Sequence, residues 1–183
     1  MHAHDLTPEQ RAMVEMWERH MAAEFQAKSV EATMATMTPT PFVNHVPVMT
    51  GGVGYNEVRH FYGTCFIPGQ PPDTEVVPVA RTVGRDRIVD EVIYKCTHTI
   101  EMPWLLPGVP PTGRRVEVAI VVVVQFEDGK IAGERIYWDQ ASVIAQVGLV
   151  DAGKLPVTGI EASRKVVDPA REASNSLIKR MSG

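Results

Sequence analysis

The sequence predicts an α+β domain of cone shape in which N-terminal helices pack on one face of an antiparallel β-sheet. Two observations lead to this class. Segments with helical spacing of apolar residues come first, and a run of long β-prone segments follows. Short turn sequences join neighbouring segments of that run, which is typical of hairpins. This order favours helices on one side of an antiparallel sheet over a doubly wound fold.

The first helix has a clear start signal. Residues 7–10 supply an N-cap threonine, a proline at the first helical position and a glutamine where a capping box needs one. Apolar side chains then recur every four positions, which predicts one buried stripe. These are Met13, Trp17, Met21 and Phe25.

Two further short helices and an extended segment are expected before the strands. Ser29 can cap a helix that runs to about Met37, where two prolines end it. Residues 42–49 are β-prone but contain a histidine and a proline, so we expect an edge strand or an extended segment. A glycine turn then leads into a helix with apolar residues at helical spacing: Val58, Phe61, Tyr62 and Cys65.

The strands are expected at residues 75–83, 87–98, 115–126 and 131–139. Turn sequences at 84–86 and 128–129 join the first pair and the last pair. Residues 103–113 are rich in proline and form a loop. The third strand is apolar on both of its faces, although the N-terminal helices can cover only one. We therefore expect a homodimer formed through the open face of the sheet.

Composition excludes several classes of protein. The chain has 183 residues, a net charge of −4 and a pI of about 5.9, so it lacks the basic field that binds nucleic acid. Its longest apolar run, residues 119–124, is too short to cross a membrane. Two cysteines without metal-ligand spacing argue against a disulfide scaffold or a zinc ribbon. A polar N-terminus predicts a cytoplasmic protein, and His2 and His4 are expected to fray and not to bind metal.

The candidate chemistry is a set of isolated ionisable residues at the ends of apolar elements. Asp139 follows two aromatic residues, and loss of solvation there would raise its pKa toward that of a general base. His45 and His98 can donate hydrogen bonds to a carbonyl or enolate oxygen. Each has a plainer reading, since Asp139 can cap a helix that starts at Gln140 and a lone strand histidine is often structural. Arg81 and Glu91 fit an ordinary cross-strand ion pair.

An ordered series of segments between Val14 and Leu149 resembles the SnoaL-like polyketide cyclases within the NTF2-like superfamily. The resemblance rests on the N-terminal helical pair, residues 45–47, 51–52, 97–99, 110–115 and 128–131, then Glu134, Asp139 and residues 146–149. It implies a domain over residues 1–150, with residues 151–183 as an extension that packs on the sheet or on a dimer partner. It also implies a curved antiparallel β-sheet that forms a cone-shaped hydrophobic pocket, no metal, no organic cofactor and a homodimer.

The resemblance implies roles for particular residues. Asp139 matches the family's acid/base position, while His45 and His98 match the histidines that hold the substrate oxygens. We expect seven further side chains to contact the substrate: Tyr55, Arg81, Glu91, Tyr94, Glu101, Trp104 and Trp138. The predicted function is proton abstraction α to the carbonyl of a small apolar compound, leading to cyclisation or isomerisation.

Two other functions stay open at this stage. One is a hydrolase or dehydratase in the same pocket, for which Asp90, Arg81 and Asp139 would form an epoxide-opening set. Asp90 and Glu91 point to opposite faces of their strand, so only one of them can enter the pocket. The other is a module that binds a small ligand or mediates dimerisation without catalysis.

Overall fold

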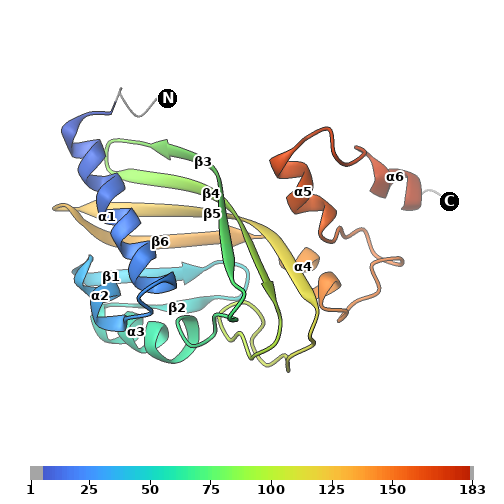
Figure 1. Ribbon diagram of the computed structural model, residues 1–183, viewed down its shortest axis with the longest axis horizontal. Helices are drawn as coiled ribbons and strands as arrows, with labels where there is room; N and C mark the ends of the chain where they lie inside the picture. Colours follow the sequence, from blue (N-terminus) through green and yellow to red (C-terminus); the bar gives the residue numbers. More distant parts are fainter. Residues whose placement is uncertain (1–5, 182–183) are drawn as a thin grey trace.

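The computed structural model describes residues 6–181, and His2 and His4 lie outside this range. The helices are α1 (Pro8–Phe25), α2 (Val30–Ala35), α3 (Tyr55–Phe61), the π-helical turn η2 (Tyr62–Phe66), α4 (Gln140–Gln146), α5 (Glu161–Val167) and α6 (Ser176–Met181) (Figure 1). The strands are β1 (Met37–His45), β2 (Thr50–Val53), β3 (Glu75–Val83), β4 (Arg87–Thr97), β5 (Arg115–Glu127) and β6 (Lys130–Trp138). The predicted order of helices followed by long strands is confirmed.

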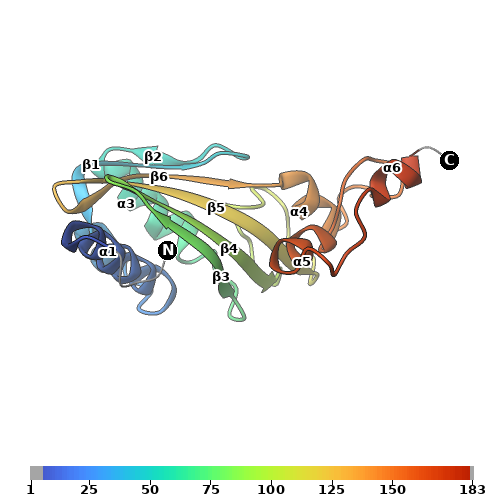
Figure 2. The ribbon, with the colours of Figure 1, turned by 90° about the horizontal axis from the view of Figure 1, so that it is seen from above.

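The strands form one curved six-stranded sheet in the order β2-β1-β6-β5-β4-β3. Neighbouring strands are antiparallel except for β1 and β6, which run parallel, so the sheet is mixed. Figure 2 shows α1 and α3 on the same side of this sheet, where its curvature encloses them. The predicted α+β class with helices on one face of a curved sheet is therefore confirmed.

The extended segment at residues 42–49 differs from the prediction. The strand β1 begins at Met37 and includes Pro39 and Pro41, and it lies between β2 and β6 instead of at an edge. Its pairing with β6 shifts register between Met37 and Phe42. The prolines fall within this irregular stretch, where regular ladder hydrogen bonds are not needed, so they do not end the strand.

The buried stripe of α1 also differs from the predicted one. Thr7 forms the predicted capping box with Gln10. The buried residues of the helix, however, are Met13, Trp17, His20, Ala23 and Glu24. Steps of four residues rotate around a helix by about 40° each, whereas alternating steps of four and three hold one face. Two ionisable side chains, His20 and Glu24, are therefore turned into the core.

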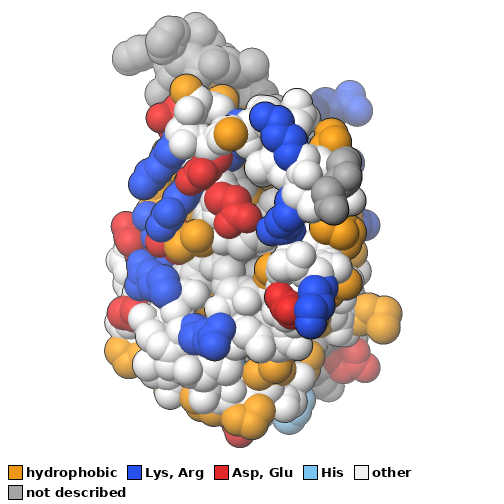
Figure 3. Space-filling view, turned by 90° about the vertical axis from the view of Figure 1, so that its right-hand side faces the viewer, with side chains coloured by type: hydrophobic (Ala, Val, Ile, Leu, Met, Phe, Trp, Pro, Cys, Tyr) orange, Lys and Arg blue, Asp and Glu red, His pale blue; other side chains and the backbone are white. Residues whose placement is uncertain are grey.

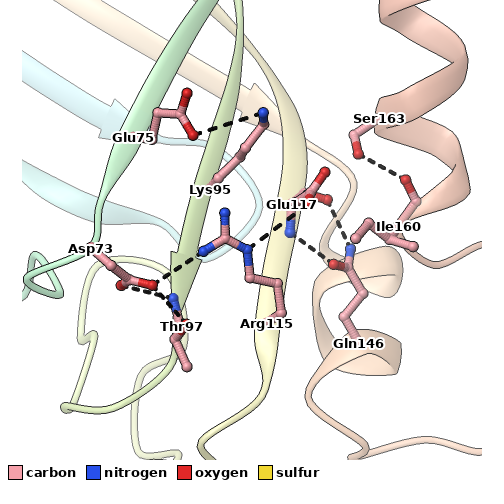
Figure 4. Close-up of polar contacts among 9 residues, drawn as sticks. All are labelled: Asp73, Glu75, Lys95, Thr97, Arg115, Glu117, Gln146, Ile160 and Ser163. Atoms are coloured by element: carbon pink, nitrogen blue, oxygen red, sulfur yellow. Dashed lines mark hydrogen bonds and ion pairs between the residues drawn. The ribbon is translucent and has the colours of Figure 1, made fainter.

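Gln146 joins the helix α4 to the end of β5 that is paired with β4 but not with β6 (Figure 4). Pairing between β5 and β6 begins only at Ile120, so Glu117 lies beyond the end of β6. The Gln146 amide takes its place: Glu117 N donates to Gln146 Oε1 at 2.8 Å, and Gln146 Nε2 donates to Glu117 O at 3.0 Å. Ser142 Oγ then donates to Gly159 O, which holds the start of the C-terminal extension against α4.

The far face of the sheet is covered only in part by the extension. Both α4 and α5 pack against β5, and Ile93 on this face is 1% exposed. Val121 and Val123 remain half-buried and Tyr137 is exposed. The homodimer through this face stays a prediction: sedimentation equilibrium at micromolar concentration should give twice the mass of the chain, and a monomer would contradict it.

The surface agrees with the composition. On the face in Figure 3, basic and acidic side chains are interspersed with apolar ones, so this end of the molecule has no continuous basic patch. Among residues 6–181, no helix is both long and apolar enough to cross a lipid bilayer.

Gly133 on β6 provides a test of the β1–β6 contact. A Cβ atom at this position would lie 2.0 Å from Cε1 of Phe42, whose ring also lies beneath the guanidinium of Arg135. We expect Gly133→Ala to lower the free energy of unfolding by about 1–3 kcal/mol, because the ring must move. Urea unfolding measures this, and an unchanged midpoint would show that the ring moves without cost.

Candidate functional site

A buried cavity lies between α1, the η2 turn and the inner face of the sheet. Its volume is about 60 Å³, and most of its wall is apolar or aromatic. At about 10–15 Å³ for each water, this is room for a handful of atoms. Four side chains bring polar chemistry to the wall: Glu24 from α1, His45 from β1, Asp90 from β4 and Glu134 from β6.

Behind two of these carboxylates lies His20, which is completely buried. Its Nε2 atom is 3.0 Å from Glu24 Oε1 and 3.2 Å from Glu134 Oε1. The hydroxyl of Tyr62 lies 3.2 Å from the same nitrogen and donates to Glu134 Oε1 at 3.1 Å. We call these four residues, His20, Glu24, Tyr62 and Glu134, the buried tetrad.

The hydrogen bonds around His20 identify its charge. Thr36 donates its hydroxyl proton to Thr33 O at 2.6 Å, so toward His20 Nδ1, also 2.6 Å away, it acts as an acceptor. Nδ1 therefore carries a proton. A lone pair on Nε2 would then face two carboxylate oxygens, which is repulsive, so Nε2 is protonated as well. Burial alone would lower the pKa of His20, but Glu24 and Glu134 together raise it to about 10.

The other members of the tetrad respond to the same burial. Desolvation raises the pKa of Glu24, against the opposing effect of His20. It also raises the pKa of the Tyr62 phenol far above its usual value, so Tyr62 keeps its proton. The ligand atoms of His20, Glu24 and Glu134 lie within 4.8 Å of one another, a spacing that a metal ion could use. The hydrogen-bond geometry instead assigns a proton to Nε2, the nitrogen that such an ion would need.

His45 lies in an aromatic cage in the wall of the same cavity. The ring centroids of Phe61, Phe66, Trp104 and Trp138 are 5.2–5.7 Å from that of the imidazole. Burial lowers the pKa of His45 to about 4, so the ring is neutral at pH 7. Its Nδ1 atom is buried without a hydrogen-bond partner in the described part of the chain. A buried nitrogen of this kind is expected to meet a ligand or a water.

Asp90 forms a rigid polar contact at the cavity's edge. It accepts hydrogen bonds from Trp17 Nε1 at 2.7 Å and from Arg81 Nε and Nη2 at 2.6 and 2.8 Å. Arg81 also pairs with Glu18 on α1 at 3.1 Å. A groove between α1 and β3 includes these three charged side chains and shares Asp90 and Phe25 with the cavity wall, which marks it as the entrance.

The structure brings only some of the predicted site residues together. His45, Tyr94 and Trp104 line the cavity, and Trp138 contacts the His45 ring from outside the lining. Arg81 reaches the site through its ion pair with Asp90, not with Glu91 as the sequence suggested.

Asp139 and His98 do not face the cavity, which corrects the expectation that they share it with His45. Asp139 is exposed, and its carboxylate accepts the backbone N–H groups of Ala141 and Ser142 as the N-cap of α4. This is the plainer reading that the sequence allowed. His98 is fully buried elsewhere, where its Nδ1 bonds to Thr112 Oγ1 at 3.1 Å in the turn after β4.

Three predicted substrate contacts are also placed elsewhere. Glu101 is exposed, and Tyr55 is exposed at the start of α3. Glu91 points to the outer face of β4, because Asp90 occupies the inner one. None of the three belongs to the cavity wall.

Sequence reasoning missed His20, Glu24 and Glu134 as site residues. His20 and Glu24 are four residues apart, a spacing that places two side chains on one helix face. Their alignment with Met13 and Trp17 in steps of four and three was the signal that could have found them. Glu134 was visible as a lone carboxylate between two isoleucines, on the face of its strand opposite Asp139.

His45 makes stability depend on pH. Its folded pKa, about 4, is below the unfolded value of about 6.5, so the unfolded chain binds more protons as pH falls between these values. The contribution of His45 should therefore lower the free energy of unfolding by up to about 3 kcal/mol as the pH falls from 6.5 to 4. Denaturant unfolding across this range should show a flatter profile for His45→Gln. His60→Gln, a change at an exposed histidine, is the control, and equal slopes in all three proteins would refute the assignment.

Comparisons with solved structures place the fold among small NTF2-like proteins. A protein from Jannaschia sp. CCS1, provisionally described as a SnoaL-like polyketide cyclase, superposes with a TM-score of 0.66 at 21% identity, over 80% of this chain and 99% of that one. AclR from Streptomyces galilaeus, provisionally described as a hydroxylase, gives 0.60 at 17% identity, over 78% and 99%. A protein with a ketosteroid isomerase-like fold from Catenulispora acidiphila, solved with trimethylamine, gives 0.56 at 15% identity, over 78% and 95%.

No curated protein matches the sequence. The sequence model of one family does match, and it spans residues 9–147, from the start of α1 to the end of α4. The tetrad and the His45 cage all lie within that span. The chain therefore belongs to the SnoaL-like polyketide cyclase family.

Proposed function

We propose that this protein is an acid/base enzyme that removes a proton α to the carbonyl of a small organic compound, without an organic cofactor or a metal. One observation carries the proposal: two carboxylates that share the buried His20 both line a small apolar cavity, and that cavity also holds a neutral histidine. Perturbed ionisable groups in a largely apolar pocket are typical of catalytic sites.

Glu134 is the proposed base. His20 and Tyr62 both contact its Oε1 atom, which fixes the orientation of the carboxylate. The second oxygen is then the one that a substrate in the cavity can reach. Asp90 is a poorer candidate, because Trp17 and Arg81 already donate three hydrogen bonds to its two oxygens. Glu134 thus takes the acid/base role that the sequence assigned to Asp139.

His45 is proposed to hold the oxygen of the substrate. Loss of an α-proton moves negative charge onto the carbonyl oxygen, and a hydrogen-bond donor at that point lowers the barrier. His45 is neutral and belongs to the cavity wall, and among residues 6–181 its Nδ1 has no hydrogen-bond partner, so the ring has an N–H that it can donate to an enolate. The surrounding aromatic rings exclude water, which strengthens this hydrogen bond.

The size of the cavity limits the substrate. About 60 Å³ suits a compound of a few heavy atoms and not a fused polycycle, unless side chains move. The small amine solved with the Catenulispora protein supports a small ligand in a fold of this kind. The hydrolase alternative loses support, because its Asp139 caps α4 and does not meet the pair of Arg81 and Asp90.

Deuterium exchange tests the proposal without knowledge of the product. The protein is incubated in D₂O with a panel of small ketones, aldehydes and esters, and NMR follows the loss of each α-proton signal. We expect catalysed exchange for at least one compound, and Glu134→Gln should slow it by about 10²–10⁴-fold, because the amide cannot accept the proton.

Two controls make the result interpretable. Glu15→Gln changes an exposed carboxylate on α1 and should leave exchange unchanged. Near-UV circular dichroism verifies that Glu134→Gln retains its fold. If no compound exchanges above the buffer rate, or if Glu134→Gln exchanges as fast as the native protein, the site is a binding site without this chemistry.

A further inference from the structure

The charges around the cavity do not balance. Glu24, Asp90 and Glu134 line it, while Arg81 and the imidazolium of His20 stand directly behind them. His45 is neutral. With all three carboxylates ionised, these groups leave one negative charge in a space walled by apolar and aromatic side chains. Burial of an uncompensated charge is costly, so this arrangement favours a bound cation or a proton on one of the carboxylates.

The aromatic walls fit an organic cation. Phe66 packs edge to face against Phe25, Tyr62 and Trp104, with ring centroids 5.2–5.9 Å apart. All four rings line the cavity that Glu24 and Glu134 also line. Aromatic rings attract an organic cation that lies over their faces, and an alkylammonium group loses less hydration energy than a metal ion when it enters an apolar cavity.

The entrance to the cavity also carries an excess of negative charge. Its groove holds Glu18, Asp90 and Arg81, which leaves one negative charge at the mouth as well. A mouth of this sign attracts a cationic ligand and repels an anionic one. Independently, His45 is part of the cavity wall, and its buried Nδ1 has no hydrogen-bond partner in the described part of the chain, which is consistent with a polar ligand beside it.

A metal ion is the competing source of positive charge. It would need Nε2 of His20, but His20 is not part of the cavity wall. That nitrogen already has Glu24, Glu134 and Tyr62 as neighbours at 3.0–3.2 Å. A ligand in the cavity therefore meets the carboxylates and not the imidazole.

We propose that the cavity recognises a small organic cation, and that the substrate carries an alkylammonium group which pairs with Glu24 among the aromatic rings. This inference rests on the proposed function for the reaction itself, with Glu134 left as the base. It refines the predicted small apolar carbonyl compound to one that bears a positively charged nitrogen. Burial raises the pKa of Glu24, whereas a cation bound beside the carboxylate lowers it, so cation binding should be accompanied by proton release.

Three probes of similar shape test the sign of the preferred charge. Calorimetry in phosphate buffer, free of amines, measures binding of tetramethylammonium, neutral tert-butanol and anionic pivalate to the native protein. We expect tetramethylammonium to bind about tenfold or more tightly than tert-butanol, and pivalate not to bind. Equal affinity for the cation and the alcohol, or tighter binding of pivalate, would overturn the proposal.

A variant of Glu24 tests whether this carboxylate contacts the cation. Glu24→Gln should weaken tetramethylammonium binding at least tenfold and leave tert-butanol unaffected, whereas Glu15→Gln on the same helix should change neither. Proton release, measured in buffers of different ionisation enthalpy, should accompany cation binding and disappear in Glu24→Gln. If Glu24→Gln does not fold, the three probes on the native protein still decide the question. Displacement of tetramethylammonium by Zn²⁺ or Mg²⁺ would favour a metal site and overturn the proposal.

The two proposals can fail separately. Glu134-dependent exchange of neutral carbonyl compounds, with no preference for tetramethylammonium, would leave the proposed reaction standing and remove the cation. Tight binding of tetramethylammonium without exchange of any α-proton would keep the cation site and remove the reaction.

Discussion

The buried ion pair between α1 and β6 is the constraint on which the interior depends. His20 joins α1 to β6 through Glu134, to η2 through Tyr62 and to the end of α2 through Thr36. Its partners must stay close, because a buried imidazolium without carboxylates beside it would destabilise the folded protein by several kcal/mol. This requirement fixes the depth of α1 on the sheet, and that depth sets the size of the cavity.

The buried tetrad contributes little net stability, because the desolvation of its charged groups offsets their mutual attraction. Well-packed apolar side chains in place of a buried ion pair are often as stable or more so. Leucines at these positions would suit the surrounding rings and would avoid the desolvation of three charged groups. The tetrad therefore fits a chemical role better than a structural one, and the neutral His45 facing the same space strengthens that reading.

Much of the fold followed from local sequence signals. The capping box at Thr7, the hairpin turns and the long valine-rich strand each specify their own conformation, and each was found where it was predicted. The parallel partner of β6 was not predictable in this way. Nothing local in residues 37–45 shows that β1 pairs with a strand more than ninety residues later, and its prolines suggested an end to regular structure.

The prediction of the site failed because the sequence pattern did not show which face of α1 and which face of β6 turn toward the interior. On β6, both alternating faces mix apolar and polar residues, so the period of two did not say which face turns inward. The sequence pattern correctly placed Arg135, Tyr137 and Asp139 on one face of the strand. That face, however, turns away from the cavity and not toward it. On α1, Met21 and Phe25 satisfied the apolar pattern while His20 beside them looked like a surface residue.

The same ambiguity shows why polar active sites are hard to find from pattern alone. A rule that puts apolar residues inside will always assign a histidine and a glutamate on an amphipathic helix to the solvent side. Here the rule fails because the two carboxylates and the imidazolium compensate one another across elements that are distant in sequence. Because two carboxylates share one imidazolium, the compensation leaves an excess of negative charge, and this excess is the reason why we propose a cation as the occupant of the cavity.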